Sequence, residues 1–333
     1  MSGRPRVAVV FTGGTISMTV DPVVGGAVPT LAGADLIARV HGLDALAEVV
    51  VIDRARTPAS HFSFADVLAI RAAIDVALAD PDLAGVVVVQ GTDTLDETAF
   101  AWDLLHGDPR PVVVTGAMRT ASDADWDGPA NLRDAVMAAA DPALRDSGVV
   151  VVMAGVVHPA DDVAKCHATA LDPFRSPNTG PLGTVRDGRV MMVRPRGPRR
   201  RIDGPCGPPP GPVDLVTAAL DTDGRPIDLA LATGARGIVV AATGAGNTHP
   251  DLLRAAVEAM AAGIPVAVAS RTGSGRVGPI YGFPGGGVAW VRAGAILAGT
   301  LTPVKARVAL VLGLGAGLDR NGLAALLADP SPP

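Results

Sequence analysis

Short apolar runs alternate with longer Ala- and Leu-rich stretches along most of the 333 residues. The runs lack polar alternation, which is typical of strands covered by helices on both faces. Strands are predicted at 6–11, 49–52, 85–89, 112–115, 149–153, 237–241 and 266–270, and helices at 34–40, 64–78, 95–105, 131–140 and 250–262. This alternation predicts an α/β fold with a mostly parallel sheet.

A stretch rich in proline, glycine and arginine interrupts this pattern between about 194 and 228. Chains of this length commonly form two domains. We therefore expect a large N-terminal α/β domain at 1–200, a linker at 201–228 and a smaller C-terminal α/β domain at 229–333. The piece 213–220 could still pack, and the basic run from Arg194 to Arg201 is expected to be solvated.

Composition excludes several classes of protein. The net charge of −5 argues against binding nucleic acid through its phosphates. No uninterrupted apolar stretch is long enough to span a bilayer, and the first residues do not read as a signal peptide. A cytoplasmic protein is therefore expected, and its two cysteines are too few for a disulfide framework.

Two polar motifs follow predicted strands, where ligands bind in open α/β sheets. Thr12-Gly13-Gly14-Thr15-Ile16-Ser17 follows the first strand, and its glycines allow close backbone approach to a ligand. It lacks the Lys-Ser/Thr of a phosphate-binding Walker loop. Gln90-Gly91-Thr92-Asp93-Thr94-Leu95-Asp96-Glu97-Thr98 follows the third strand. Thr94 and Glu97 have the spacing of a capping box, which leaves Thr92 and Asp93 without a structural role.

Further motifs follow in order along the chain. They are Val114–Arg119 (VTGAMR), Asp127–Leu132 (DGPANL), Lys165 with 172–176 (DPFRS) and 180–183 (GPLG), and 299–301 (GTL) with 305–307 (KAR). Together with the first two motifs, this set resembles the bacterial L-asparaginase family over nearly the whole chain. The resemblance implies the two-domain asparaginase-like fold and hydrolysis of a small side-chain amide, such as L-asparagine to L-aspartate and ammonia, through a threonine acyl-enzyme.

The resemblance also implies roles for individual residues. Thr15 matches the primary nucleophile, and Thr92, Asp93 and Lys165 match the second threonine, the aspartate and the lysine. The chemistry agrees, because a threonine hydroxyl needs a nearby base or charge to become a nucleophile. A lysine beside an aspartate can supply both. The residues alone do not decide which threonine attacks first.

Positions for substrate binding also carry over. Backbone groups at Gly14 and Gly91 could form an oxyanion hole, Asp93 would also hold the substrate's ammonium group, and Ser60 lies in the substrate-binding segment. Asn247 matches an asparagine that the C-terminal domain lends to a neighbouring subunit. A homodimer or homotetramer with sites at subunit interfaces is therefore expected. No metal or cofactor is expected.

One of several departures from the family lies in the loop after the nucleophile. The loop 20–30 lacks the tyrosine that commonly assists the nucleophile, since the only tyrosine is Tyr281. This departure keeps two alternatives open. One is an amidase for glutamine, a D-amide or a specialised metabolite, and the other is a non-catalytic amino-acid-binding protein.

Two other patterns are given a structural interpretation. Gly273–Gly278 fits GxGxxG but no helix is predicted after it, which favours a loop over a dinucleotide site. A polar cluster, His158, Asp161, Asp162, Cys166 and His167, matches no standard zinc spacing. We interpret it as a loop that supports Lys165.

Overall fold

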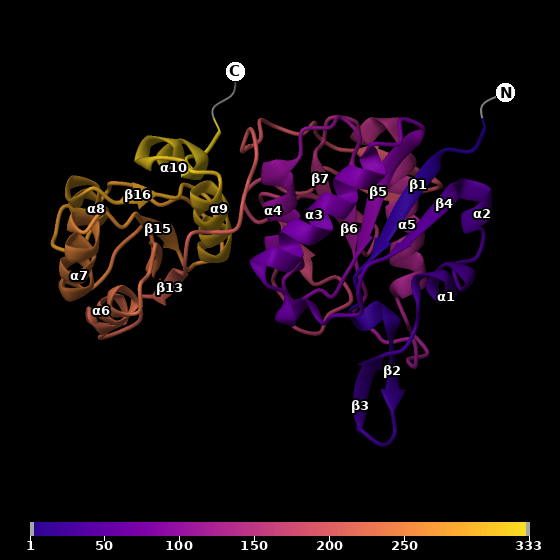
Figure 1. Ribbon diagram of the computed structural model, residues 1–333, viewed down its shortest axis with the longest axis horizontal. Helices are drawn as coiled ribbons and strands as arrows, with labels where there is room; N and C mark the ends of the chain where they lie inside the picture. The colour runs from indigo at the N-terminus through magenta and orange to yellow at the C-terminus, as the bar shows by residue number, and fades with distance from the viewer. Residues whose placement is uncertain (1–2, 331–333) are drawn as a thin grey trace. The chain divides into compact units, whose positions relative to one another are not determined.

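A computed structural model describes residues 3–330 of the chain (Figure 1). The chain divides into two compact units, with the division between Gly197 and Pro198. Each unit contains a parallel sheet with helices, so the predicted two-domain α/β fold is confirmed. Within the described residues, no helix is long and apolar enough to cross a membrane.

The N-terminal unit is built on an eight-stranded sheet with the order β12-β11-β8-β7-β6-β5-β1-β4. Five adjacent strands are parallel, and each overlaps a predicted run: β4 (Glu48–Asp53), β1 (Arg6–Phe11), β5 (Leu83–Val89), β6 (Val112–Thr115) and β7 (Val149–Met153). Three strands that the sequence did not predict extend one edge by antiparallel pairing: β8 (Val156–Pro159), β11 (Gly183–Arg186) and β12 (Arg189–Met192).

Helices cover both faces of this sheet (Figure 1). On one face lie α5 (Gly128–Ala140), α1 (Gly33–Ala38) and α2 (Leu43–Leu46), and on the other lie α3 (Phe64–Leu78) and α4 (Leu95–Leu105). Val87 and Val89 of β5 belong to the core under α5. Val86 and Val88, which alternate with them along the strand, are equally buried. Burial on both faces explains why the strand sequences show no polar alternation.

The chain order around β1 creates a position for a site. β1 pairs with β4 on one side, and the next long strand, β5, pairs on its other side. Connections therefore leave β1 and β5 in opposite directions, which opens a crevice beyond their carboxyl ends. Phe11 is in register with Val89, so the two polar motifs leave the sheet at neighbouring points.

Two small hairpins lie outside the large sheet. β2 (Met18–Asp21) pairs with β3 (Gly26–Pro29) and extends away from the sheet (Figure 1). β9 (Ala164–Lys165) pairs with β10 (Phe174–Arg175). Three 3₁₀ turns complete this unit, at Thr15–Ser17 (η1), Ala59–His61 (η2) and Pro142–Leu144 (η3).

The C-terminal unit has a four-stranded parallel sheet in the order β13-β14-β15-β16, formed by Val213–Thr217, Gly237–Ala242, Val266–Ser270 and Ile296–Leu297. The helices of this unit are α6 (Arg225–Ala232), α7 (Pro250–Ala261), α8 (Gly287–Ala293), α9 (Pro303–Gly315) and α10 (Arg320–Leu327). α7 packs Leu252 and Ala255 against Ile238 and Val240 of β14. The segment 201–228, expected as a linker, contains β13 and the start of α6.

The basic run between the units differs from its prediction. Arg196 has a side chain only 6% exposed, and it forms ion pairs of 2.9 Å with Asp103 and Asp161. Arg200 is equally buried, and its guanidinium lies 2.9 Å from the Asp329 carboxylate. The prediction of solvated arginines is therefore wrong for these two, because each has acidic partners that are distant in sequence. Such buried pairs fix each end of the connection to its own unit.

Candidate active site

The ε-amino group of Lys165 is the centre of a polar cluster at the carboxyl edge of the large sheet. It donates hydrogen bonds of 2.9 Å to the Thr92 hydroxyl and 3.0 Å to the Asp93 carboxylate. Thr92 is buried, the Lys165 side chain is 16% exposed and that of Asp93 is 64% exposed. The structure therefore brings these three predicted residues together, and the carboxylate of Asp93 is largely exposed to solvent. An exposed pair of this kind contributes little to stability, so its main effect is to orient the amine.

Local structure holds Lys165 in this position. Its backbone is paired with Phe174 across the β9–β10 hairpin, and its N–H donates 3.2 Å to the Asp96 carboxylate on the first turn of α4. Beyond the hairpin, the Asp162 carboxylate accepts hydrogen bonds from Asn178 and Thr179. Sequence reasoning missed Asp96, since nothing in the sequence links it to a residue 69 positions away. The only other lysine, Lys305, is buried in α9 and 1% exposed.

Thr15 reaches the same edge through the glycine pair that precedes it. Gly13 and Gly14 have φ values of 108° and 94°, which other residues rarely adopt. A Cβ atom on Gly14 would lie 2.2 Å from the Gly91 nitrogen, so the two motif loops are packed backbone against backbone. Thr15 then begins η1 as a half-buried residue. Within residues 3–330, no hydrogen bond fixes its hydroxyl.

Ser60 lies beside the second motif on the exposed side of η2. The Thr94 hydroxyl donates a hydrogen bond of 3.0 Å to the carbonyl of Ala59, the residue before Ser60, and so links η2 to the end of β5. Thr94 precedes α4 as predicted, but its side chain makes no capping bond, so the predicted capping box is wrong. The hydroxyl is instead a second donor to the Ala59 carbonyl, which also accepts from the Phe62 N–H at 3.2 Å.

The DGPANL segment, at the start of α5, holds the loop after β6 through hydrogen bonds. Asp127 accepts hydrogen bonds from the backbone N–H groups of Met118 and Arg119, between 2.9 and 3.1 Å. Asn131 donates 3.1 Å to the Gly116 carbonyl, and a Cβ on Gly116 would lie 2.5 Å from the Gln90 carbonyl oxygen. These contacts shape the loop after β6 against the strand end that carries Thr92.

The β2–β3 hairpin follows Thr15 directly and corresponds to the loop that lacks a tyrosine. Its one acid, Asp21, accepts hydrogen bonds from the Val23 and Val24 N–H groups and so closes the turn. The Ser122 hydroxyl accepts 3.0 Å from the Val20 N–H, which connects the hairpin to the loop after β6. Valines make up its exposed tip, so no acid–base group of the hairpin replaces the missing phenol.

Asn247 belongs to the C-terminal unit, in the loop after β14. Its backbone N–H and carbonyl both bond to Thr243 at 2.9 Å. Its side-chain oxygen is buried and accepts no hydrogen bond from the described residues. In the same unit, the GxGxxG segment Gly273–Gly278 forms exposed turns after β15, and the next helix begins only at Gly287. This agrees with a loop, not with a dinucleotide site.

The polar cluster weighed as a metal site is dispersed into structural contacts. The buried His158 lies 2.8 Å from the Ser176 hydroxyl, and Asp161 pairs with Arg196. The ring nitrogen of His167 accepts from the N–H groups of Thr169 and Ala170. Among the described residues, no group of three or more His, Cys, Asp or Glu side chains is arranged to hold a metal ion.

Comparison with known proteins identifies the family. Residues 6–196 match the family model described as "Asparaginase, N-terminal", and residues 212–327 match "Glutaminase/Asparaginase C-terminal domain". The chain belongs to the asparaginase family. It is 34% identical to a "Probable L-asparaginase" of Deinococcus radiodurans over 96% of each chain. It is 31% identical to an "L-asparaginase" of Bacillus licheniformis over 92% of this chain and 94% of the other.

A further relative, "L-asparaginase 2" of Escherichia coli, is 34% identical over 69% of this asparaginase and 66% of its own length. Family membership makes the protein a hydrolase that acts on linear amides, as the sequence predicted. The alternative of a non-catalytic amino-acid-binding protein is therefore not favoured. The family implies a small amide as the substrate.

Proposed function

We propose that the protein hydrolyses L-asparagine to L-aspartate and ammonia, with Thr15 as the nucleophile that forms the acyl-enzyme. The observation that carries this assignment is the contrast between the two threonines. The Thr92 hydroxyl is occupied by the Lys165 amine at 2.9 Å, whereas the Thr15 hydroxyl has no fixed partner and follows two glycines. The Thr15 hydroxyl is therefore free to turn toward a substrate, whereas Thr92, already bonded to the amine, would act as part of the base that activates it.

The first step would form a bond between Thr15 Oγ1 and the side-chain amide carbon. The carbonyl electrons move onto oxygen, where backbone N–H groups beside Gly14 and Gly91 stabilise the charge. The C–N bond then breaks, the nitrogen takes up the threonine proton and ammonia leaves. Water attacks the resulting ester, which releases aspartate and restores the Thr15 hydroxyl.

Thr92, Lys165 and Asp93 would move the protons for both steps. Lys165 Nζ is within hydrogen-bonding distance of both side chains, so a proton can pass between the amine and the Thr92 hydroxyl. Asp93 is largely exposed, which leaves a carboxylate oxygen available for the substrate's α-ammonium group. Ser60, also exposed and next to this loop, would contact the α-carboxylate.

We further propose that the active form is a homo-oligomer in which Asn247 of one subunit completes the site of another. The buried side-chain oxygen of Asn247, which lacks a partner within residues 3–330, supports this proposal. A polar atom of this kind is costly unless a ligand or another chain supplies a donor.

A trapping experiment tests the nucleophile. The enzyme is mixed with L-asparagine, quenched in acid and digested, and the masses of its peptides are measured by mass spectrometry. We expect an added aspartyl group on the peptide that carries Thr15, and none in Thr15→Ala. An aspartyl group on the peptide that carries Thr92 would contradict the assignment. The same preparation, assayed for ammonia with L-asparagine, D-asparagine and L-glutamine, identifies the preferred amide.

A further inference from the structure

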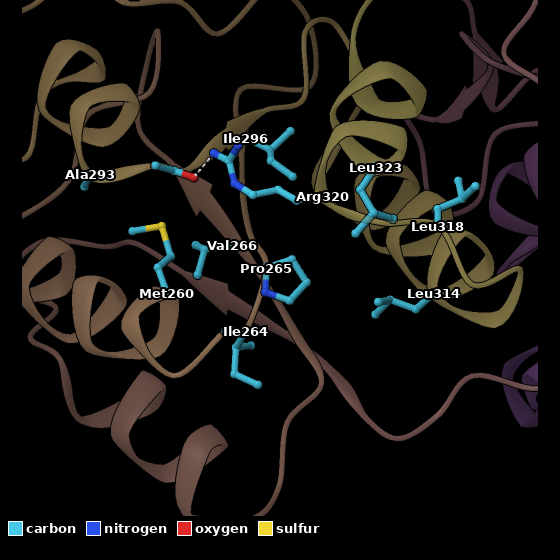
Figure 2. Close-up of a pocket in the computed structure, with 12 residues that line it drawn as sticks. Met260, Ile264, Pro265, Val266, Ala293, Ile296, Leu314, Leu318, Arg320 and Leu323 are labelled. Atoms are coloured by element: carbon cyan, nitrogen blue, oxygen red, sulfur yellow. Dashed lines mark hydrogen bonds between the residues drawn. The ribbon is translucent and has the colours of Figure 1, made fainter.

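The C-terminal unit contains a cavity of about 360 Å³ that the proposed chemistry does not use (Figure 2). It opens at the amino ends of the strands, next to the turns that precede β15 and β16. The Asn247 loop follows the carboxyl end of β14, so the cavity and Asn247 lie at opposite edges of the same sheet. The volume is within the range of small-molecule sites.

Two glycines lie in the turns that line the cavity. Gly263 and Gly294 have φ values of 81° and 99°, which glycine tolerates best. A Cβ on Gly263 would meet no atom within 4 Å. Around these turns, the lining side chains other than Arg320 are apolar and come from α7, α8, β15, β16 and the α9–α10 region; they include Met260, Ile264, Leu314 and Leu323.

One charged side chain lines the cavity, beside backbone polar groups. Arg320, on the first turn of α10, extends its guanidinium across the opening and donates to the Gly294 carbonyl at the end of α8 (Figure 2). Among the described residues, no carboxylate lies within ion-pair distance of it. Most of its five N–H donors therefore remain available, and a guanidinium binds carboxylates best through two parallel bonds.

We propose that this cavity, hereafter the Arg320 cavity, binds a small monocarboxylate with a branched or short apolar tail. The carboxylate would pair with Arg320, and the tail would displace water from the leucine and isoleucine side chains. None of the described residues that line it is acidic, so no carboxylate is there to pair with an ammonium group. Amino acids, including the substrate and product of the proposed reaction, should therefore bind more weakly than the acid.

Three matched compounds test this ligand class on the full-length protein. 4-Methylpentanoate has the tail and the charge, 4-methylpentan-1-ol has only the tail, and L-leucine adds an α-ammonium group to the same acid. We expect saturable binding of the acid alone, measured by calorimetry and saturation-transfer NMR at ligand concentrations up to about 10 mM.

Three variants locate the binding. Arg320→Gln keeps a donor for the Gly294 carbonyl but removes the charge, and it is expected to weaken the acid about tenfold or more. Ala293→Phe, at the half-exposed rim, should block binding sterically. Arg292→Gln removes the neighbouring exposed arginine, which does not line the cavity, and should leave the affinity unchanged.

The outcomes separate clearly. Loss of affinity in Arg320→Gln, with the wild-type melting temperature, supports the Arg320 cavity, and this variant decides even if Ala293→Phe does not fold. The proposal is overturned if the wild type shows no saturable binding, if the alcohol or leucine binds as tightly as the acid, or if Arg320→Gln binds the acid normally.

Discussion

The amine of Lys165 lies 2.9 Å from the hydroxyl oxygen of Thr92, although the two residues are 73 positions apart in the chain. The contact joins a two-residue strand of the β9–β10 hairpin to the end of β5. Thr92 itself is 4% exposed, so the contact is shielded from bulk water on one side. A weakly hydrated amine next to a hydroxyl is a suitable proton carrier.

Removal of this amine should stop turnover. Lys165→Met keeps the length of the side chain but cannot exchange protons, so we expect kcat to fall by about 10³-fold. Thr92→Val should have a similar effect, and the double variant should be no worse than either single one, because the two act as a unit. Steady-state ammonia release measures all three. If the loss of kcat in the double variant were instead the product of the two single losses, the two residues would not belong to one proton path.

Thr15 should be replaceable only by another nucleophile. Thr15→Ala is expected to lower kcat about 10³-fold or more with little change in melting temperature, because its hydroxyl makes no hydrogen bond within residues 3–330. Thr15→Ser retains the hydroxyl and serves as the control, with partial activity. Wild-type ammonia release by Thr15→Ala would eliminate this residue as the nucleophile.

Asp96 is expected to act as a positioning residue. Its carboxylate accepts the Lys165 N–H at 3.2 Å, so Asp96→Ala would release the lysine strand from α4. We expect kcat to fall about 10- to 100-fold, since small displacements of a reacting group are costly, with little change in KM. Asp96→Asn retains an acceptor oxygen and should restore most of the activity. Equal losses in both variants would instead indicate a role for the negative charge.

Asn247 should affect substrate binding without affecting the fold. Its backbone, not its side chain, maintains the turn with Thr243, so Asn247→Ala preserves both 2.9 Å bonds. We expect KM for L-asparagine to rise about tenfold, the value of one or two lost hydrogen bonds. Sedimentation of the same sample reports whether subunits still associate. An unchanged KM would remove Asn247 from the site.

The acid stability of the N-terminal unit should depend on Asp108. Hydrogen bonds from Arg110 hold the pKa of Asp108 at about 2, below the ordinary aspartate value of 3.8. The stabilisation is therefore complete above about pH 4 and is lost as the pH falls through about 2. We expect Asp108→Asn to lose about 1–2 kcal/mol at pH 7, an amount reduced for the partial exposure of the pair.

Urea unfolding at several pH values measures this effect. The difference between wild type and Asp108→Asn should shrink between about pH 4 and pH 2, because both then carry a neutral side chain. Asp75→Asn is a suitable comparison, since the Asp75 side chain is 52% exposed and its pair with Arg71 lies on a helix surface. A difference that stays constant with pH would contradict the role of the Asp108 charge.

The sequence predicted the parts of this protein whose signals are local. Buried valine runs predicted all five parallel strands of the large sheet, and α3 and α4 have the predicted bounds. The glycine motifs at Gly14 and Gly91 were identified because each directly follows a predicted strand, where ligands bind in α/β sheets. β8 was missed because it is short and closely follows β7, and β13 because it lies in the stretch rich in proline, glycine and arginine that was interpreted as a linker.

Contacts between distant segments could not be predicted in the same way. Arg196 was expected in solvent because its neighbours are prolines and glycines, yet Asp103 and Asp161 bury it. Thr94 had the spacing of a capping box, but the carbonyl of Ala59 is a competing acceptor that only the fold brings near. In both cases the local pattern was outweighed by a partner from another segment.

The scarcity of lysine has a practical consequence. Only two of the 28 basic residues are lysines, and Lys305 is buried, so Lys165 carries the one ε-amino group with appreciable access to solvent. Activated esters, which couple enzymes to resins or polymers through amines, would therefore consume the proposed proton carrier as they attach. Immobilisation through lysine and inactivation would be the same event, and the exposed thiol of Cys166 is no alternative because it directly follows Lys165 in the chain.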